Sequence, residues 1–212
     1  MLKLSRIDRL IVNFDQGLRT IFGQPLTSAR PNPAQHVESD ELTASEKQLT
    51  ARLMRVNHAG EVAAQALYQG QALTARSETI YASLQQSARE ENDHLVWCKM
   101  RVKACGGHVS FLDPLWYAGS FTIGALAGIV GDKWSLGFVI ETERQVIVHL
   151  DQHLQRLPER DAESRAILLQ MQEDEAHHAT VALKAGGVML PVPIKWAMKG
   201  TAKVMTNVAF WI

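Results

Sequence analysis

Two copies of a Glu-x-x-His motif, Glu91–His94 and Glu175–His178, stand 84 residues apart in this chain. Each follows a lone upstream glutamate, Glu61 in the first half and Glu143 in the second, by 30 and 32 residues. In a helix, residues three apart lie on one face, so each motif can direct a carboxylate and an imidazole at one point. A glutamate from each of two helices and a Glu-x-x-His pair from each of two more form the ligand set of a four-helix di-iron bundle. The repeat therefore predicts an all-α protein built around two metal ions.

Spacing alone leaves two of these positions open. Glu141 competes with Glu143, because the two lie about 200° apart around a helix and only one can face inward. Asp174–His177 is likewise a rival to Glu175–His178. A further alternative is that both motifs lie on solvated helix faces and bind nothing.

A metal is expected if these side chains face the core. Several carboxylates buried together repel one another and lose their hydration, which costs many kcal/mol unless a cation compensates. Carboxylate and imidazole ligands without a thiolate favour iron or manganese over a structural zinc site.

Hydrophobic spacing with the period of a helix runs through most of the chain, and nothing between residues 45 and 187 alternates as a strand would. A capping box from Ser45 to Gln48 is expected to begin the first bundle helix. Gly106-Gly107, Pro158 and Gly186-Gly187 are expected to end later ones. The predicted bundle helices span residues 45–76, 77–104, 113–157 and 161–185.

This pattern predicts three segments. Residues 1–45 hold an amphipathic helix (2–22) and a proline-rich linker, residues 46–190 form the di-iron bundle, and residues 191–212 form an amphipathic C-terminal helix. With 46% hydrophobic residues in 212, the chain can bury one sizeable core.

Both terminal segments have features of helices that lie on a membrane. In the C-terminal one, Lys195, Lys199 and Lys203 form a basic stripe beside Trp196 and large aliphatic residues, which suits an anionic bilayer surface. The alternative is that both helices only cover the bundle. Residues 115–131 carry no charge over about 25 Å of helix, but contain a Gly124–Gly128 pair and small residues, so we expect close packing rather than a membrane span.

Charge and cysteine content narrow the function further. The formal net charge is zero, so nothing points to a nucleic-acid partner. Cys98 and Cys105 offer no disulfide framework and no paired metal ligands, and we expect two packed thiols in a reducing compartment.

At four places the chain resembles one known family. These are Arg55–Glu61 and the residues after it, Glu91–His94, Glu143 with His149 six residues later, and Glu173–His178. They are similar to the demethoxyubiquinone hydroxylase family of ubiquinone biosynthesis, a membrane-bound branch of the ferritin-like di-iron proteins. The resemblance extends from about Gln48 to the C-terminus, so residues 1–45 lie outside its strongest part.

The resemblance implies a ferritin-like four-helix bundle and assigns roles to individual residues. Glu91 and Glu175 would bridge the two irons, and Glu61 and Glu143 would be terminal ligands. His149 would support the centre from outside the ligands or take part in redox chemistry, although an ordinary core histidine is the alternative. The implied iron ligands are Glu61, Glu91, His94, Glu143, Glu175 and His178.

The resemblance also implies an activity. The chain would be an O2-dependent di-iron monooxygenase that hydroxylates the ring of a polyprenyl demethoxyubiquinol. It would use two iron ions and electrons from NADH or a reduced quinol, neither stably bound. Its partners would be the quinol, membrane lipids and other ubiquinone-biosynthesis proteins, and it would lie peripherally on the cytoplasmic face of the bacterial inner membrane.

Three other functions fit the ligand pattern less well. A ferritin- or rubrerythrin-like iron-handling protein would not need apolar terminal helices, and a di-iron tRNA hydroxylase would need a basic face. A metal-free membrane-associated scaffold is the third.

Overall fold

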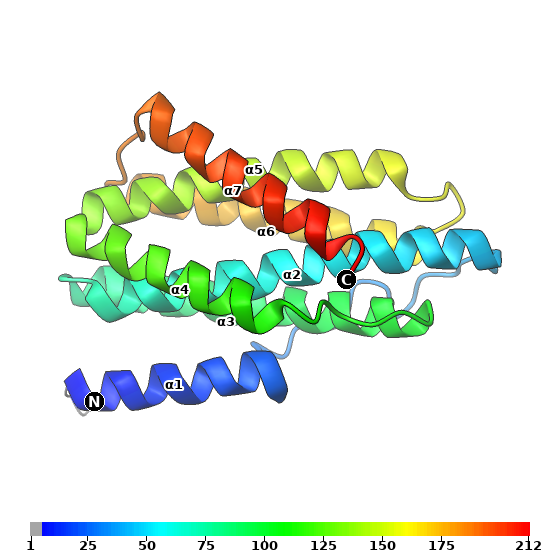
Figure 1. Cartoon of the computed structure of the whole chain (residues 1–212), viewed down its shortest axis with the longest axis horizontal. Helices are drawn as coiled ribbons and strands as arrows, with labels where there is room; N and C mark the ends of the chain where they lie inside the picture. Colours follow the sequence, from blue (N-terminus) through cyan, green and yellow to red (C-terminus); the bar gives the residue numbers. More distant parts are fainter. Residues whose placement is uncertain (1–5) are drawn as a thin grey trace.

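The structure, a computed structural model, describes residues 6–212, and within this range it contains helices and no strand (Figure 1). The all-α prediction is confirmed, while residues 2–5 of the predicted N-terminal helix lie outside the described range. The helices are α1 (Arg6–Phe22), α2 (Ala44–Thr74), α3 (Glu78–Ala104), α4 (Asp113–Val130), α5 (Asp132–Arg156), α6 (Ala162–Lys184) and α7 (Val192–Ala209).

Four helices, α2, α3, α5 and α6, form the bundle that carries the repeated motifs. Helix α2 packs on α3, α5 packs on α6, and α3 meets α6 across the centre. One apolar cluster, which includes Leu53, Trp97 and Met171, fills one end of the bundle. A second, which includes Tyr68 and Ile140, fills the other. The motif residues lie between these clusters along each helix, so apolar side chains shield them on both sides.

The predicted single helix over residues 113–157 was wrong, because the chain breaks at Gly131. The φ angle of Gly131 is 134°, a backbone conformation that residues other than glycine rarely adopt. The carboxylate of Asp132 accepts hydrogen bonds from the backbone N–H groups of Arg76 and Ser77, each at 3.0 Å. The break is thus fastened to the α2–α3 connection, and α4 can lie across α2 while α5 continues in the bundle.

Small residues let α4 approach α2 closely. A Cβ atom at Gly124 would lie 2.2 Å from the carbonyl oxygen of Leu67, and one at Gly70 would lie 2.2 Å from that of Phe121. The Gly124–Gly128 pair therefore serves packing inside the molecule, as expected. In the part of the chain that the structure describes, no helix combines the length and apolar character needed to cross a bilayer.

The predicted capping box was wrong by two residues. Thr43 is the N-cap of α2: its Oγ1 accepts from the backbone N–H of Glu46 at 3.3 Å, and the Glu46 carboxylate accepts from the Thr43 N–H at 2.8 Å. A carboxylate at this position also interacts favourably with the positive end of the helix dipole, whereas the neutral amide of Gln48 would not.

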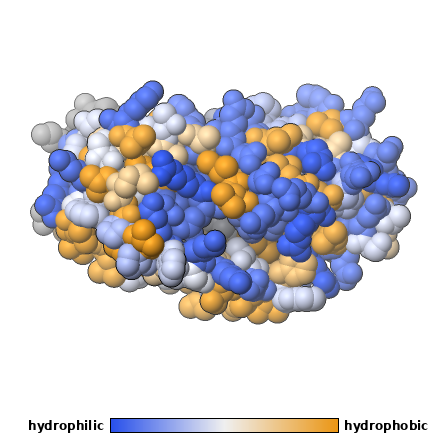
Figure 2. Space-filling model, turned by 90° about the horizontal axis from the view of Figure 1, so that it is seen from above, coloured by the Kyte–Doolittle hydropathy of each residue, from blue (hydrophilic) through white to orange (hydrophobic). Residues whose placement is uncertain are grey.

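The terminal helices α1 and α7 turn apolar side chains outward. On α1, Phe14 and Phe22 are more than two-thirds exposed, while Thr20 faces inward and is buried. On α7, Trp196 is 75% exposed. Figure 2 shows exposed hydrophobic residues as separate patches among hydrophilic ones on the face that it displays.

The end of the chain returns to the bundle. Phe210 packs against the first apolar cluster, and the guanidinium of Arg52 lies 4.6 Å from the ring centre of Trp211. The two cysteines are free and buried, in agreement with the expected packed thiols.

Candidate metal centre

Six buried side chains converge at the middle of the bundle, one from α2, one from α5 and a pair from each of α3 and α6. None is more than 3% exposed. They are Glu61, Glu91, His94, Glu143, Glu175 and His178. One ligand atom from each of four of them, Glu61, Glu91, His94 and Glu175, lies within 4.8 Å of the others.

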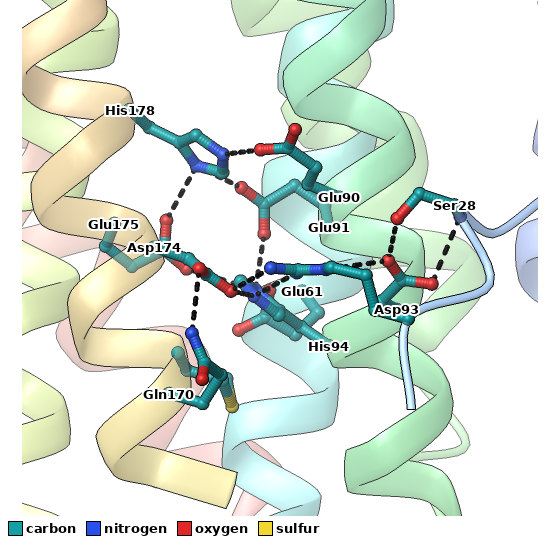
Figure 3. A network of polar contacts seen from close by, with 12 residues as sticks. Ser28, Glu61, Glu90, Glu91, Asp93, His94, Gln170, Asp174, Glu175 and His178 are labelled. Carbon is teal, nitrogen blue, oxygen red and sulfur yellow. Dashed lines mark hydrogen bonds and ion pairs between the residues drawn. The ribbon is translucent and has the colours of Figure 1, made fainter. Parts of the chain in front are cut away.

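The His94 imidazole has a different partner at each nitrogen (Figure 3). Its Nδ1 lies 3.2 Å from Glu91 Oε2, 3.3 Å from Glu175 Oε1 and 3.6 Å from Glu61 Oε2. Its Nε2 lies 2.7 Å from Asp174 Oδ2, to which the N–H donates. Because a metal-binding histidine commonly donates its second N–H to a carboxylate, this arrangement directs Nδ1 at the cluster.

His178 repeats the arrangement from the opposite helix. Its Nδ1 lies 3.1 Å from Glu91 Oε1 and 3.1 Å from Glu175 Oε2, and its Nε2 lies 2.7 Å from Glu90 Oε2. Glu91 and Glu175 each present one oxygen to each histidine. The two halves of the site are therefore related by an approximate two-fold axis.

Glu143 completes the set from α5, and Tyr68 holds it. The Tyr68 hydroxyl donates to Glu143 Oε1 at 2.5 Å, and both side chains are buried. Burial, together with repulsion from Glu175 and Glu91, raises the pKa of Glu143 well above its usual range. Tyr68 was not among the predicted site residues, although it lies two helix turns after Glu61 and so on the same face of α2.

The charges of the cluster suit a cation. Burial raises the pKa of Glu61 well above its usual range, against an opposing contact with His94. Burial alone would lower the pKa of His94, but Asp174, Glu175 and the other carboxylates raise it well above its usual value. Protonated imidazole thus balances carboxylate charge that a bound cation would otherwise balance.

Two oxygens at the centre have only an imidazole beside them. Glu61 Oε2 lies 3.6 Å from His94 Nδ1 and Glu91 Oε1 lies 3.1 Å from His178 Nδ1, and neither oxygen accepts a well-directed hydrogen bond from any residue that the structure describes. Burying a carboxylate oxygen without a good hydrogen bond costs free energy. Binding a metal ion would remove this cost, because carboxylate oxygens are common metal ligands in proteins. The residues present therefore fit a carboxylate- and imidazole-bound metal pair.

The structure separates the alternative residues at the two ligand positions that spacing left undecided. Glu141 points away from the centre and pairs with Lys195 of α7 at 3.2 Å. His177 is exposed, and Asp174 reaches His94 only from outside the cluster. The geometry thus favours Glu143 over Glu141 and Glu175–His178 over Asp174–His177 as ligands.

His149 stands apart from these six residues. Its ring centre lies 4.0 Å from that of His153, whose Nδ1 lies 2.8 Å from Asn57 Oδ1. Burial, reinforced by Arg156, lowers the pKa of His149 to about 4. Among the described contacts none joins His149 to the cluster, so its proposed supporting role stays a prediction.

Two residues of the linker before α2, Ser28 and Arg30, also bind carboxylates beside the site, and no sequence pattern pointed to them. The Ser28 backbone N–H and hydroxyl both donate to the Asp93 carboxylate, and Arg30 Nη1 lies 2.7 Å from Asp174 Oδ2. No regular spacing connects these linker residues to the motifs.

Comparisons with known proteins agree with this arrangement. The family described as ubiquinone biosynthesis protein COQ7 matches residues 48–209. The 3-demethoxyubiquinol 3-hydroxylase of Nitrosococcus oceani is 61% identical, over 99% of this chain and 98% of its own length. The proteins of the same name from Nitrosomonas europaea and Nitrosospira multiformis are 55% and 53% identical, each over 99% of this chain and 100% of its own length.

Proposed function

The chain belongs to the ubiquinone biosynthesis protein COQ7 family and is a hydroxylase, and we propose that it hydroxylates the ring of a polyprenyl 3-demethoxyubiquinol. The observation that carries this proposal is the pair of reciprocal histidine–carboxylate sets buried at the centre of the bundle. An iron-handling protein or a tRNA hydroxylase could use a similar set, but the relatives' shared name supports the quinol reaction.

The six buried residues Glu61, Glu91, His94, Glu143, Glu175 and His178 would hold two iron ions. When bound, the iron pair would supply the activation of dioxygen, with one oxygen atom entering the ring and the other leaving as water after two external electrons and two protons are added. Four carboxylates balance the charge of two divalent ions, which leaves the buried centre near neutrality.

Residues around the ligands have supporting tasks. Glu90 and Asp174 hold the two imidazoles with Nδ1 inward, and Tyr68 orients Glu143. The apolar clusters at both ends keep water from the centre. We expect the electrons to come from NADH or a reduced quinol that binds only transiently, since residues 6–212 contain no glycine-rich dinucleotide motif after a strand.

A test of this function loads the metal-free protein anaerobically with Fe(II), then adds dioxygen, a reductant and a demethoxyquinol. We expect about two irons per chain and a product heavier by one oxygen atom. Glu175→Ala should lose iron and hydroxylation while keeping its helix content, and Glu173→Ala, an exposed position on the same helix, should keep all three. A protein that hydroxylates the quinol equally well without metal would refute the proposal.

We further propose that the enzyme lies on the cytoplasmic face of the bacterial inner membrane, where a polyprenyl substrate resides. Support comes from the exposed apolar residues of α1, α4 and α7, among them Phe14, Leu126 and Trp196. Lys199 and Lys203 are exposed on α7, as an anionic surface requires, whereas Lys195 is paired with Glu141.

Vesicle flotation tests this location. Phe14→Ser and Trp196→Ser should weaken binding to vesicles that contain anionic lipid, because each removes a large apolar side chain from the lipid-facing surface. Leu169→Ser, at an exposed apolar position on α6, serves as the control. Equal binding by all three variants would contradict the proposed membrane face.

A further inference from the structure

Arg30, in the linker between α1 and α2, reaches across two bundle helices beside the metal centre. Its Nε lies 3.1 Å from Asp93 Oδ2 on α3, and its Nη1 lies 2.7 Å from Asp174 Oδ2 on α6. Its guanidinium also lies 5.1 Å from the ring centre of Trp97. The linker thus supplies a planar cation that pairs with a carboxylate of α3 and one of α6 at the edge of the site.

The oxygen that Arg30 holds is the one that orients a histidine. Asp174 Oδ2 accepts from His94 Nε2 at 2.7 Å and from Arg30 at the same distance. Arg30 Nη2 also lies 3.3 Å from His94 Nε2 itself, and the other described contact of Asp174 is to the Gln170 amide at 3.1 Å. Its side chain is 13% exposed, so without Arg30 it could rotate toward water.

The other half of the site is built differently. Glu90, the partner of His178, is one methylene longer than Asp174, and its described polar contact outside the centre is a neutral amide, that of Gln86 at 2.7 Å. The residue that corresponds to Asp93 in the second motif is His177, which is exposed. Within residues 6–212, no contact places an arginine on Glu90 as Arg30 is placed on Asp174.

We propose that Arg30 is a positioning residue that fixes Asp174 against His94 and so makes the two metal positions unequal. The inference rests on the proposed iron centre. An arginine fork gives a carboxylate a defined direction, and loss of such outer contacts typically weakens metal binding about 10- to 100-fold. The position that uses His94 therefore depends on a direct contact with the linker, whereas the described contacts give the position that uses His178 no such contact.

A variant of Ser28 can distinguish the proposed positioning role of Arg30 from a purely structural role in holding the linker. Ser28 fastens the same linker to the same Asp93 carboxylate but touches neither Asp174 nor His94. Ser28→Ala should therefore loosen the linker and leave the metal positions as they are. Arg30→Met keeps an unbranched apolar chain beside Trp97 and removes the charge, and Arg30→Lys keeps the charge but not the fork.

The experiment titrates the full-length protein and the three variants anaerobically with Fe(II), and records Mössbauer spectra and thermal unfolding of each. Wild type and Ser28→Ala should bind both equivalents alike. In Arg30→Met one of the two equivalents should bind at least about 10-fold more weakly, with one of the two iron signals changed, and Arg30→Lys should lie between.

The outcomes distinguish the two proposals. If Arg30→Met loses thermal stability but titrates like wild type, or if Ser28→Ala loses the same equivalent, the positioning role is refuted and the iron centre stands. If wild type itself binds no iron, the proposed function fails. Should Arg30→Met not fold, Arg30→Lys against Ser28→Ala decides by the same comparison.

Discussion

Replacing His153 by glutamine should make the protein less sensitive to acid. Burial, with smaller contributions from His149 and Arg156, lowers the pKa of His153 to about 2, against 6.5 for a free histidine. The folded state therefore resists a proton that the unfolded chain accepts. The stability that depends on neutral His153 is complete above about pH 6.5 and is lost as the pH falls below it.

The size of the effect follows from this difference. Each pH unit between the two pKa values costs about 1.4 kcal/mol, so wild type should lose about 2 kcal/mol through His153 between roughly pH 7.5 and pH 5. For a domain of this size that corresponds to a fall of about 4–8 °C in Tm. A glutamine at this position cannot titrate, and its amide can still donate to Asn57 Oδ1, which His153 contacts at 2.8 Å.

Thermal unfolding of metal-free wild type and His153→Gln at both pH values measures this difference. The other titrating groups are the same in both proteins, so their contributions cancel when the variant is compared with wild type. His153→Gln should be relatively more stable at the lower pH by about 2 kcal/mol. If the stability difference between the two proteins is the same at both pH values, His153 is not a buried neutral group and the reasoning is wrong.

Two further predictions concern packing and the ligand shell. Gly124→Ala should destabilise the protein by about 1–3 kcal/mol or more in chemical denaturation, because its Cβ would meet the Leu67 carbonyl oxygen at 2.2 Å. Gly119→Ala, with open space at the same helix, should be neutral or stabilise by up to about 1 kcal/mol, and equal losses for both would contradict the close contact. Tyr68→Phe removes the hydroxyl that donates to Glu143 and should cost about 1–3 kcal/mol in unfolding free energy, whereas an unchanged value would show that this hydrogen bond contributes nothing.

The sequence was sufficient for the bundle and for the inward position of the motif residues. A Glu-x-x-His pair has to lie on one face of a helix to act together, and two such pairs with matching upstream glutamates leave few arrangements other than facing helices. All six predicted side chains are buried at one place, as this geometry requires. Their role as iron ligands stays a prediction.

What the sequence did not reveal depends on contacts between distant segments. Gly131 looks like any glycine in a helical pattern, and it becomes a break because Asp132 binds the start of α3. Arg30 lies in a linker with no periodic pattern, and its partners come from α3 and α6. Periodicity describes a helix and its faces, but it does not say which loop closes over them.

Each of the two histidines is held by a carboxylate that comes from the other histidine's helix. His94 on α3 relies on Asp174 of α6, and His178 on α6 relies on Glu90 of α3. Such reciprocal contacts have the form found where two identical subunits meet across a two-fold axis. A fragment holding only α2 and α3 would contain Glu61, Glu91 and His94 but neither Glu175 nor the second histidine, so neither metal position would be whole. The two halves of this chain are thus related as the partners of a dimer would be, and the loop and α4 between them keep those partners permanently together.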